Sequence, residues 1–259
     1  MRILLGITLL IGFFVFQERA NKVYKSGIDW KEPVVVTPGE RPSDAPSDAV
    51  VLFGGTDLSE WRGGDRCTVA EGAFRIGDKG ISTKRKFDDF QLHLEWSCDD
   101  PPKGESQKRG NSGIYIMGRY EIQILDSYGN QTYFDGQAAS VYKQTPPAVN
   151  AMKPPGQWNT YDIFWTAPRF NPDETLKSPA FVTVVHNGVL VINHFKVKGN
   201  TAHNKPPGYK AHGATGPINL QKKLQQVRFR NIWVRDYRSA QVNEPADGDT
   251  GEKSTGIEK

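Results

Sequence analysis

Two carboxylates in one short segment are the residues of this chain best suited to acid–base chemistry. Glu121 and Asp126 lie in the run Tyr-Glu-Ile-Gln-Ile-Leu-Asp. Two carboxylic groups whose surroundings move their pKa values apart can divide the roles of acid and base. In a regular strand the two side chains would point to opposite faces, and a β-bulge near Leu125 would bring them to the same side. In the alternative interpretation, Asp126 simply caps the turn that follows it.

The histidines offer a third group. His186 falls at a predicted hairpin turn and His194 at a strand end, which favours structural roles for both. His203 and His212 lie in a loop rich in glycine and proline. A histidine on a loop that a rigid scaffold carries is suited to catalysis or to metal binding. We therefore take His212 as the third catalytic candidate, beside Glu121 and Asp126.

The elements that must position these groups show a strict alternation of polar and apolar side chains. It runs through residues 90–96, 111–117 and 120–125. Successive side chains of a strand point to opposite faces, so pairing of these strands would give one apolar face and one polar face. We expect the polar face to bind sugar hydroxyls through Gln91, His93, Glu95, Asn111, Tyr115 and Gln123. Any antiparallel sheet with one wet face also alternates in this way, without any function.

Short alternating runs of this kind predict an all-β fold, a two-sheet antiparallel jelly-roll sandwich. Helical periodicity is nearly absent. Strands are predicted at residues 73–76, 90–96, 113–117, 120–125, 158–165, 181–186, 189–194 and 227–234. Asn187-Gly188 between two β-branched runs favours a tight turn, so residues 181–194 are predicted to form a hairpin.

The two ends of the chain differ from this domain. Residues 1–20 combine Arg2 with an apolar run that ends at Phe16, which indicates a signal peptide or an N-terminal anchor and hence export to the periplasm, the medium or the cell envelope. Residues 21–48 are rich in proline and are predicted to form an extended linker. Residues 239–259 contain no aromatic residue and are predicted to be disordered. The sandwich is expected to occupy residues 49–238.

Charge and cysteine content narrow the partners. The formal net charge is +4, and the two basic clusters, at residues 84–86 and 222–223, are not interleaved with aromatic residues, which argues against nucleic acid as a partner. A membrane partner is expected only through the N-terminal anchor. Cys67 and Cys98 form either one disulfide or two separate thiols.

Seven short segments occur in the order seen in one known family. Over residues 50–237 the chain resembles the 3-keto-disaccharide hydrolase domain family at residues 52–61, 111–115, 120–126, 154–162, 186–189, 216–221 and 229–232. The resemblance implies a concanavalin A-like jelly roll and cleavage of glycosides already oxidised at C3. A ketone at C3 acidifies the proton on C2, so a base can remove this proton while the C1 substituent leaves, and water then adds. Direct acid/base hydrolysis is the other route.

Such a reaction needs a base, an acid, and a group that stabilises the enolate oxygen, which can be an amide, a phenol, a guanidinium or a divalent cation. No cofactor is required by the sequence. In one place the chain departs from the family, because Leu220-Gln221 is followed by Lys222 and Lys223 where many relatives have Asp-His-Gly. The alternative function is a noncatalytic carbohydrate-binding module that uses the same sandwich face.

Overall fold

The computed structural model describes residues 27–28, 32–224 and 227–237 of the chain. The predicted export signal and the predicted disordered tail lie outside these residues, and so do residues 21–26 and 29–31 of the predicted linker. Within the described part, no helix is long and apolar enough to cross a membrane. The described residues from Pro33 onward belong to one compact unit, almost free of α-helix.

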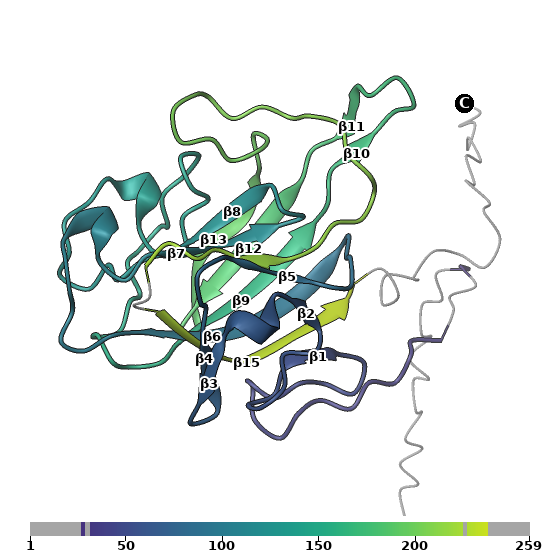
Figure 1. Ribbon diagram of the computed structural model, residues 1–259. Coiled ribbons are helices and arrows are strands. Elements are labelled where there is room, and N and C mark those ends of the chain that lie inside the picture. Colours follow the sequence, from purple (N-terminus) through teal and green to yellow (C-terminus); the bar gives the residue numbers. More distant parts are fainter. Residues whose placement is uncertain (1–26, 29–31, 225–226, 238–259) are drawn as a thin grey trace, which may run out of the picture. The chain divides into compact units, whose positions relative to one another are not determined.

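Two antiparallel sheets make up this unit (Figure 1). The larger, eight-stranded sheet has the strand order β13-β12-β9-β6-β15-β4-β3, and β1 pairs with β15. Its strands are β1 (Val50–Phe53), β3 (Thr68–Ala70), β4 (Ala73–Arg75), β6 (Phe90–Cys98), β9 (Asn159–Thr166), β12 (Phe181–His186), β13 (Val189–Lys196) and β15 (Val227–Asp236). We call it sheet A.

The smaller, five-stranded sheet has the order β2-β5-β14-β7-β8. Its strands are β2 (Trp61–Arg62), β5 (Ile81–Thr83), β7 (Ser112–Ile116), β8 (Tyr120–Ile124) and β14 (Asn219–Leu220). We call it sheet B. A separate ribbon of β10 (Arg169–Phe170) and β11 (Leu176–Ser178) and three short 3-10 helices, η1 (Gly64–Arg66), η2 (Ser106–Lys108) and η3 (Phe134–Gly136), complete the described elements.

The core lies between the apolar faces of the two sheets. The largest buried side chains come from both, and they include Trp96 and Trp165 of sheet A and Tyr120 of sheet B. The rings of Tyr120 and Trp165 lie 5.2 Å apart, and the Tyr161 hydroxyl donates to the Gln123 carbonyl at 3.0 Å. These contacts hold the inner face of β8 against β9. The predicted two-sheet sandwich is confirmed.

The hairpin predicted at Asn187-Gly188 is present between β12 and β13. Both residues have positive φ angles, 53° and 78°, which is the conformation that a two-residue primed turn requires. The predicted grouping of the strands into sheets was correct only in part. Residues 90–96 were expected to pair with residues 111–125, whereas β6 lies in sheet A and β7 and β8 lie in sheet B.

The predicted linker is not free of the sheet throughout. Its last part crosses the outer face of sheet A, where the Ser43 carbonyl accepts hydrogen bonds from Asn231 and Trp233. Asp48 forms an ion pair with Arg235 at 2.6 Å. Residues 33–48 are therefore anchored to the sandwich.

The turn gives a first prediction. Gly188→Ala is expected to lower the free energy of unfolding by about 1 kcal/mol, because a β-carbon disfavours the positive φ even though no atom lies within 4 Å of its place. Urea denaturation measures this change. Gly208→Ala is the matched control, since its surroundings are equally open but its φ is not positive. An equal loss in both variants would contradict a conformational cause.

Candidate functional site

The outer face of sheet B carries a row of polar side chains from four neighbouring segments. Tyr115 pairs with Glu121 on one side and with Asn219 on the other. Beyond β8 the row continues to Tyr142, whose amide donates to the Glu121 carbonyl at 3.1 Å. The neighbouring residues Ile122 and Val141 point into the core. Alternation along the chain therefore places Asn219, Tyr115, Glu121 and Tyr142 on the same outer face.

The carboxylate of Glu121 is held at the centre of this row. Its Oε2 atom accepts a hydrogen bond from the Tyr115 hydroxyl at 2.8 Å. Its Oε1 atom lies over Gly113, where an added β-carbon would come within 2.5 Å of it. No hydrogen bond to Oε1 is found among the described residues. Glycine at position 113 therefore gives the carboxylate room to lie across β7, with one oxygen fixed and the other unpaired.

Burial sets the protonation of this group. Only 4% of Glu121 is exposed. Burial raises the pKa of its carboxyl group, the hydrogen bond from Tyr115 and the charge of Lys223 lower it, and the result is a pKa of about 7. A carboxyl group that is partly ionised near neutral pH can take up a proton and give it back. This is the protonation behaviour expected of a catalytic acid–base group.

A hollow of about 370 Å³ adjoins the row on the side of Tyr115. Ser82, Asn219, Gln221 and Lys222 are among the residues that line it. The Gln221 side chain donates to the Tyr115 hydroxyl at 3.3 Å, which links the hollow to the hydrogen bond that holds Glu121. Hydroxyl, amide and ammonium groups around an open hollow are suited to a polyhydroxylated ligand.

On the other side of Glu121 lies a group of aromatic rings. The Tyr142 hydroxyl is shared between the Tyr133 hydroxyl, at 2.7 Å, and His203 Nδ1, at 2.9 Å. The ring of His203 stacks on that of Tyr142, and the Lys143 ammonium lies 3.3 Å from the centre of the Tyr133 ring. Neither Tyr142 nor His203 was among the predicted site residues.

Two predicted ligands of the sugar, Asn111 and Gln123, lie on the same face beneath a covering loop. Both side-chain amides donate to Gln107, at 3.2 and 3.0 Å. Asn111 Oδ1 and Gln123 Oε1 are buried, and neither has a hydrogen-bond partner within the described part of the chain. These two amides therefore form a polar layer under the loop, beside Glu121 and Tyr115.

The other three predicted ligands lie elsewhere, and the expectation of one shared face was wrong. Gln91, His93 and Glu95 belong to β6, and their outer face is that of sheet A, on the far side of the core from Glu121. The alternation was read correctly, but it identifies which face a side chain occupies and not which sheet the strand joins. These three residues cannot contact a ligand bound at Glu121.

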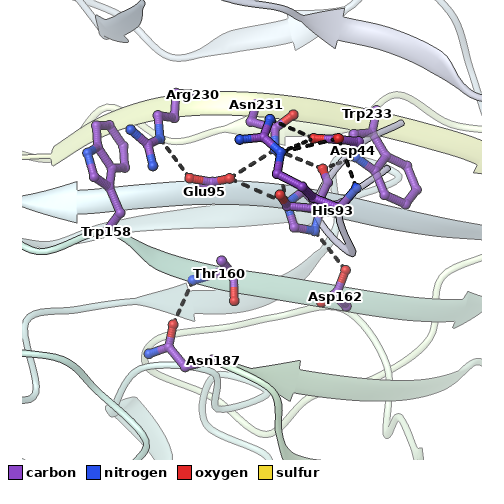
Figure 2. A network of polar contacts seen from close by, with 12 residues as sticks. Asp44, His93, Glu95, Trp158, Thr160, Asp162, Asn187, Arg230, Asn231 and Trp233 are labelled. Atoms are coloured by element: carbon purple, nitrogen blue, oxygen red, sulfur yellow. Dashed lines mark hydrogen bonds and ion pairs between the residues drawn. The ribbon is translucent and has the colours of Figure 1, made fainter. Parts of the chain in front are cut away.

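His93 and Glu95 instead belong to a saturated polar network (Figure 2). His93 Nδ1 lies 2.7 Å from Asp162, and Glu95 bonds to Arg230 at 2.6 Å and to Asn231 at 2.9 Å. Burial opposes the charge of His93, but the carboxylates of Asp162 and Glu95 outweigh it and raise its pKa to about 9.

Glu95 shows the opposite shift in the same network. Burial opposes its ionisation, but hydrogen bonds from His93, Asn231 and Arg230 lower its pKa to about 2. Both groups are therefore permanently charged near neutral pH. Asn231 and Trp233, which hold the Ser43 carbonyl, border this network. The network and the two residues that border it therefore anchor residues 33–48 to the outer face of sheet A.

Asp126 and His212 do not join Glu121. No bulge is found between β7 and β8, and Asp126 is paired with Arg109 at 2.7 Å while it accepts the Tyr128 amide. The alternative interpretation of Asp126 as a turn cap fits these contacts. His212 bonds to the Tyr120 hydroxyl at 2.7 Å, and Tyr120 points to the inner side of β8. Burial lowers the pKa of His212.

The described residues contain neither a cluster of metal-ligating side chains nor a disulfide. Within them, no group of three or more His, Cys, Asp or Glu side chains is placed to hold a metal ion. Cys67 and Cys98 are separate thiols, which decides between the two alternatives that the sequence left open.

Comparison with known proteins agrees with this fold. Residues 48–235 match the family model of the 3-keto-alpha-glucoside-1,2-lyase-like domain. The chain is 24% identical to a 3-keto-disaccharide hydrolase of Bacteroides thetaiotaomicron over 73% of this chain and 80% of that protein. It is 42% identical to a candidate glycosyl hydrolase of Parabacteroides distasonis of known crystal structure, with a TM-score of 0.76 over 88% of this chain and 100% of the other. A second such structure from that organism, at 22% identity and a TM-score of 0.54, shares the fold over 73% of this chain and 98% of its own.

Glu121→Gln is expected to stabilise the fold at pH 8 and to leave it unchanged at pH 4. Because the pKa of Glu121 rises from 4.5 to about 7 on folding, the stability that its protonated form contributes is fully present below pH 4.5 and is lost as the pH rises through 7. Glutamine is neutral at every pH, so the variant escapes this loss, which is worth about 3 kcal/mol. Urea unfolding at pH 4, 6 and 8 measures the difference. A variant that is equally destabilised at all three values would refute the pKa argument.

Tyr115→Phe is expected to move the pKa of Glu121 further upward. The phenol donates to the carboxylate and so favours its ionised form, and the benzyl ring cannot. The pKa can be followed by carbon-detected NMR of labelled glutamate side chains. Tyr128→Phe, at an exposed tyrosine, is the control and should leave the titration unchanged. An unchanged titration in Tyr115→Phe would show that the hydrogen bond does not set this pKa.

Proposed function

This chain belongs to the family of 3-keto-alpha-glucoside-1,2-lyase-like domains, and from that premise we propose that it cleaves the glycosidic bond of a 3-keto-glycoside with Glu121 as the proton-transferring group. The relatives are named as hydrolases of the glycosidase type, one of them for 3-keto-disaccharides. The observation that carries the proposal is the Glu121 carboxyl group, buried, with a pKa of about 7 and with Oε1 unpaired.

The first step of the proposed reaction suits such a group. The C3 ketone withdraws electrons from the C2–H bond, so Glu121 can remove the C2 proton to give an enolate. A base whose pKa lies near the ambient pH is partly ionised and still holds the proton well enough to return it later. Because Tyr115 fixes one oxygen of the carboxylate, the other keeps a defined position for the proton transfer.

The enolate also needs a donor or a positive charge close to C3. Gln221 and the ammonium groups of Lys222 and Lys223 are the groups at hand. Lys223 lies near enough to Glu121 to lower its pKa. The two lysines that replace the Asp-His of many relatives thus bring positive charge to the site, and a cation stabilises an enolate. This favours retained activity in spite of the departure.

Two routes lead from the same groups to the same product. In one, the C1 substituent leaves from the enolate and water then adds to the double bond. In the other, water displaces the substituent at C1 with acid/base assistance, and the C2–H bond stays intact. A substrate deuterated at C2 distinguishes them, because only elimination breaks the bond to this deuterium and is slowed by a primary kinetic isotope effect. A sample without enzyme controls for spontaneous exchange beside the ketone.

Glu121→Gln is expected to lower kcat/KM for a 3-keto-disaccharide by about 10²–10⁴-fold, the usual effect of losing a positioned base. In the wild type, kcat/KM should rise with pH and level off above pH 7, following ionisation of this carboxyl group. Circular dichroism checks that the variant is folded. Undiminished turnover would remove Glu121 from the mechanism. Binding of unoxidised oligosaccharides with no product from any 3-keto-glycoside would instead identify a carbohydrate-binding module.

A further inference from the structure

Two phenols flank Glu121, one on β7 and one on the irregular segment that bonds to the other edge of β8, and they make different contacts. Tyr115 donates its proton to the carboxylate at 2.8 Å. Tyr142 occupies the equivalent position on the other side, but its hydroxyl bonds to Tyr133 and to His203. The Tyr142 amide donates to the Glu121 carbonyl at 3.1 Å, and the charge of Glu121 acts on the Tyr142 hydroxyl, so the two residues are neighbours. Only one of the two phenols is needed to fix the carboxylate.

The loop that carries His203 is anchored to the same point of β8. The Glu121 amide donates to the Thr201 hydroxyl at 2.9 Å, and the Thr201 amide donates to the Arg119 carbonyl at 2.9 Å. His203 follows two residues later, and its ring stacks on that of Tyr142 with an angle of 12° between the planes. His203 is exposed, whereas Tyr142 is buried. Tyr142 and His203 thus connect the buried neighbourhood of Glu121 with solvent.

Burial, a hydrogen bond and neighbouring carboxylates raise the pKa of Tyr142, so its hydroxyl stays protonated, which is the form that an acid needs. The hydrogen bond is the one with the Tyr133 hydroxyl, and the carboxylates are those of Glu121 and Asp135. The Lys143 ammonium lies 3.3 Å from the centre of the Tyr133 ring and 5.9 Å from that of Tyr142. The same ammonium forms an ion pair with Asp135 at 3.6 Å and a cation–π contact with the face of the Tyr133 ring.

We infer that Tyr142 is the acid that protonates the departing glycosidic oxygen, and that His203 replaces the proton from solvent. The inference rests on the proposed function. It gives the two phenols beside Glu121 separate tasks, since Tyr115 positions the base and Tyr142 serves the leaving group.

Every proton and electron pair of this reaction is accounted for. Glu121 takes the C2 proton, and the electron pair of the C2–H bond forms the enolate. The enolate then re-forms the C3 ketone and a C1–C2 double bond, while the C1–O bond breaks with its electron pair on the leaving oxygen. Tyr142 protonates that oxygen, and protonated His203 restores the phenol. Water next adds through its oxygen to C1, Glu121 returns its proton to C2, and the surplus proton of the water passes through Tyr142 to His203.

Two substrates with different leaving groups can distinguish a role of Tyr142 as an acid from a purely structural role. A sugar alcohol needs a proton in order to leave, whereas 4-nitrophenolate does not. Tyr142→Phe is expected to lower kcat/KM for a 3-keto-disaccharide by about 10²–10³-fold and that for 4-nitrophenyl 3-keto-glucoside by less than about tenfold. Glu121→Gln should lower both rates. His203→Gln should lower the disaccharide rate, and added imidazole should restore part of it.

His212→Gln is the matched control, because His212 lies on the same loop but bonds to Tyr120 on the inner side of β8. It should leave the ratio of the two rates unchanged. Equal losses of Tyr142→Phe on the two substrates, or no loss on either, would overturn the inference and point to Glu121 as the acid as well as the base. Failure of the wild type on both substrates would instead refute the proposed function.

Discussion

The packing of β8 between the core and the outer face fixes the position of everything at the site. Ile122 and Ile124 are almost fully buried on its inner side, and Tyr120 packs on Trp165. Because the side chains of a strand alternate, the inner contacts leave no freedom for Glu121 and Gln123, which must face outward. A slip of one residue would bury a carboxylate in the core and expose the isoleucines. The apolar contacts therefore position the carboxylate that we propose as the proton-transferring group.

The two outer faces of the sandwich carry similar residue types and differ in their electrostatics. In sheet A, His93, Glu95 and Arg230 have partners of opposite charge, and the pKa values of His93 and Glu95 move apart to about 9 and about 2. Such groups keep their charge near neutral pH and serve to hold chain segments together. In sheet B, burial dominates and leaves Glu121 with a pKa of about 7. A perturbed group without a saturating counter-ion is the usual mark of an active site.

Much of this architecture was predictable from local patterns. The alternation in β6, β7 and β8, and the turn at Asn187-Gly188, depend on neighbouring residues alone and were read correctly. Which sheet each strand joins depends on long-range pairing, so the assignment of His93 and Glu95 to the face of Glu121 was wrong. The sequence alone also could not show which of the two loop histidines, His203 or His212, contacts the outer side of sheet B. Only the folded chain shows that His203 meets Tyr142 and that His212 meets Tyr120.

Tyr142 was missed for a related reason, and its position bears on how the site is built. It belongs to no regular strand, yet the backbone bonds of residues 139–142 to β8 extend sheet B by one irregular segment. A regular strand at this edge would continue the row with its full length of side chains. An irregular one supplies a single phenol and then turns away at Lys143, whose φ is 60°. The turn allows the Lys143 ammonium to lie over the Tyr133 ring. The irregular edge thus places a phenol beside the carboxylate and a cation behind the phenol, which a regular strand could not do, because its successive side chains point to opposite faces.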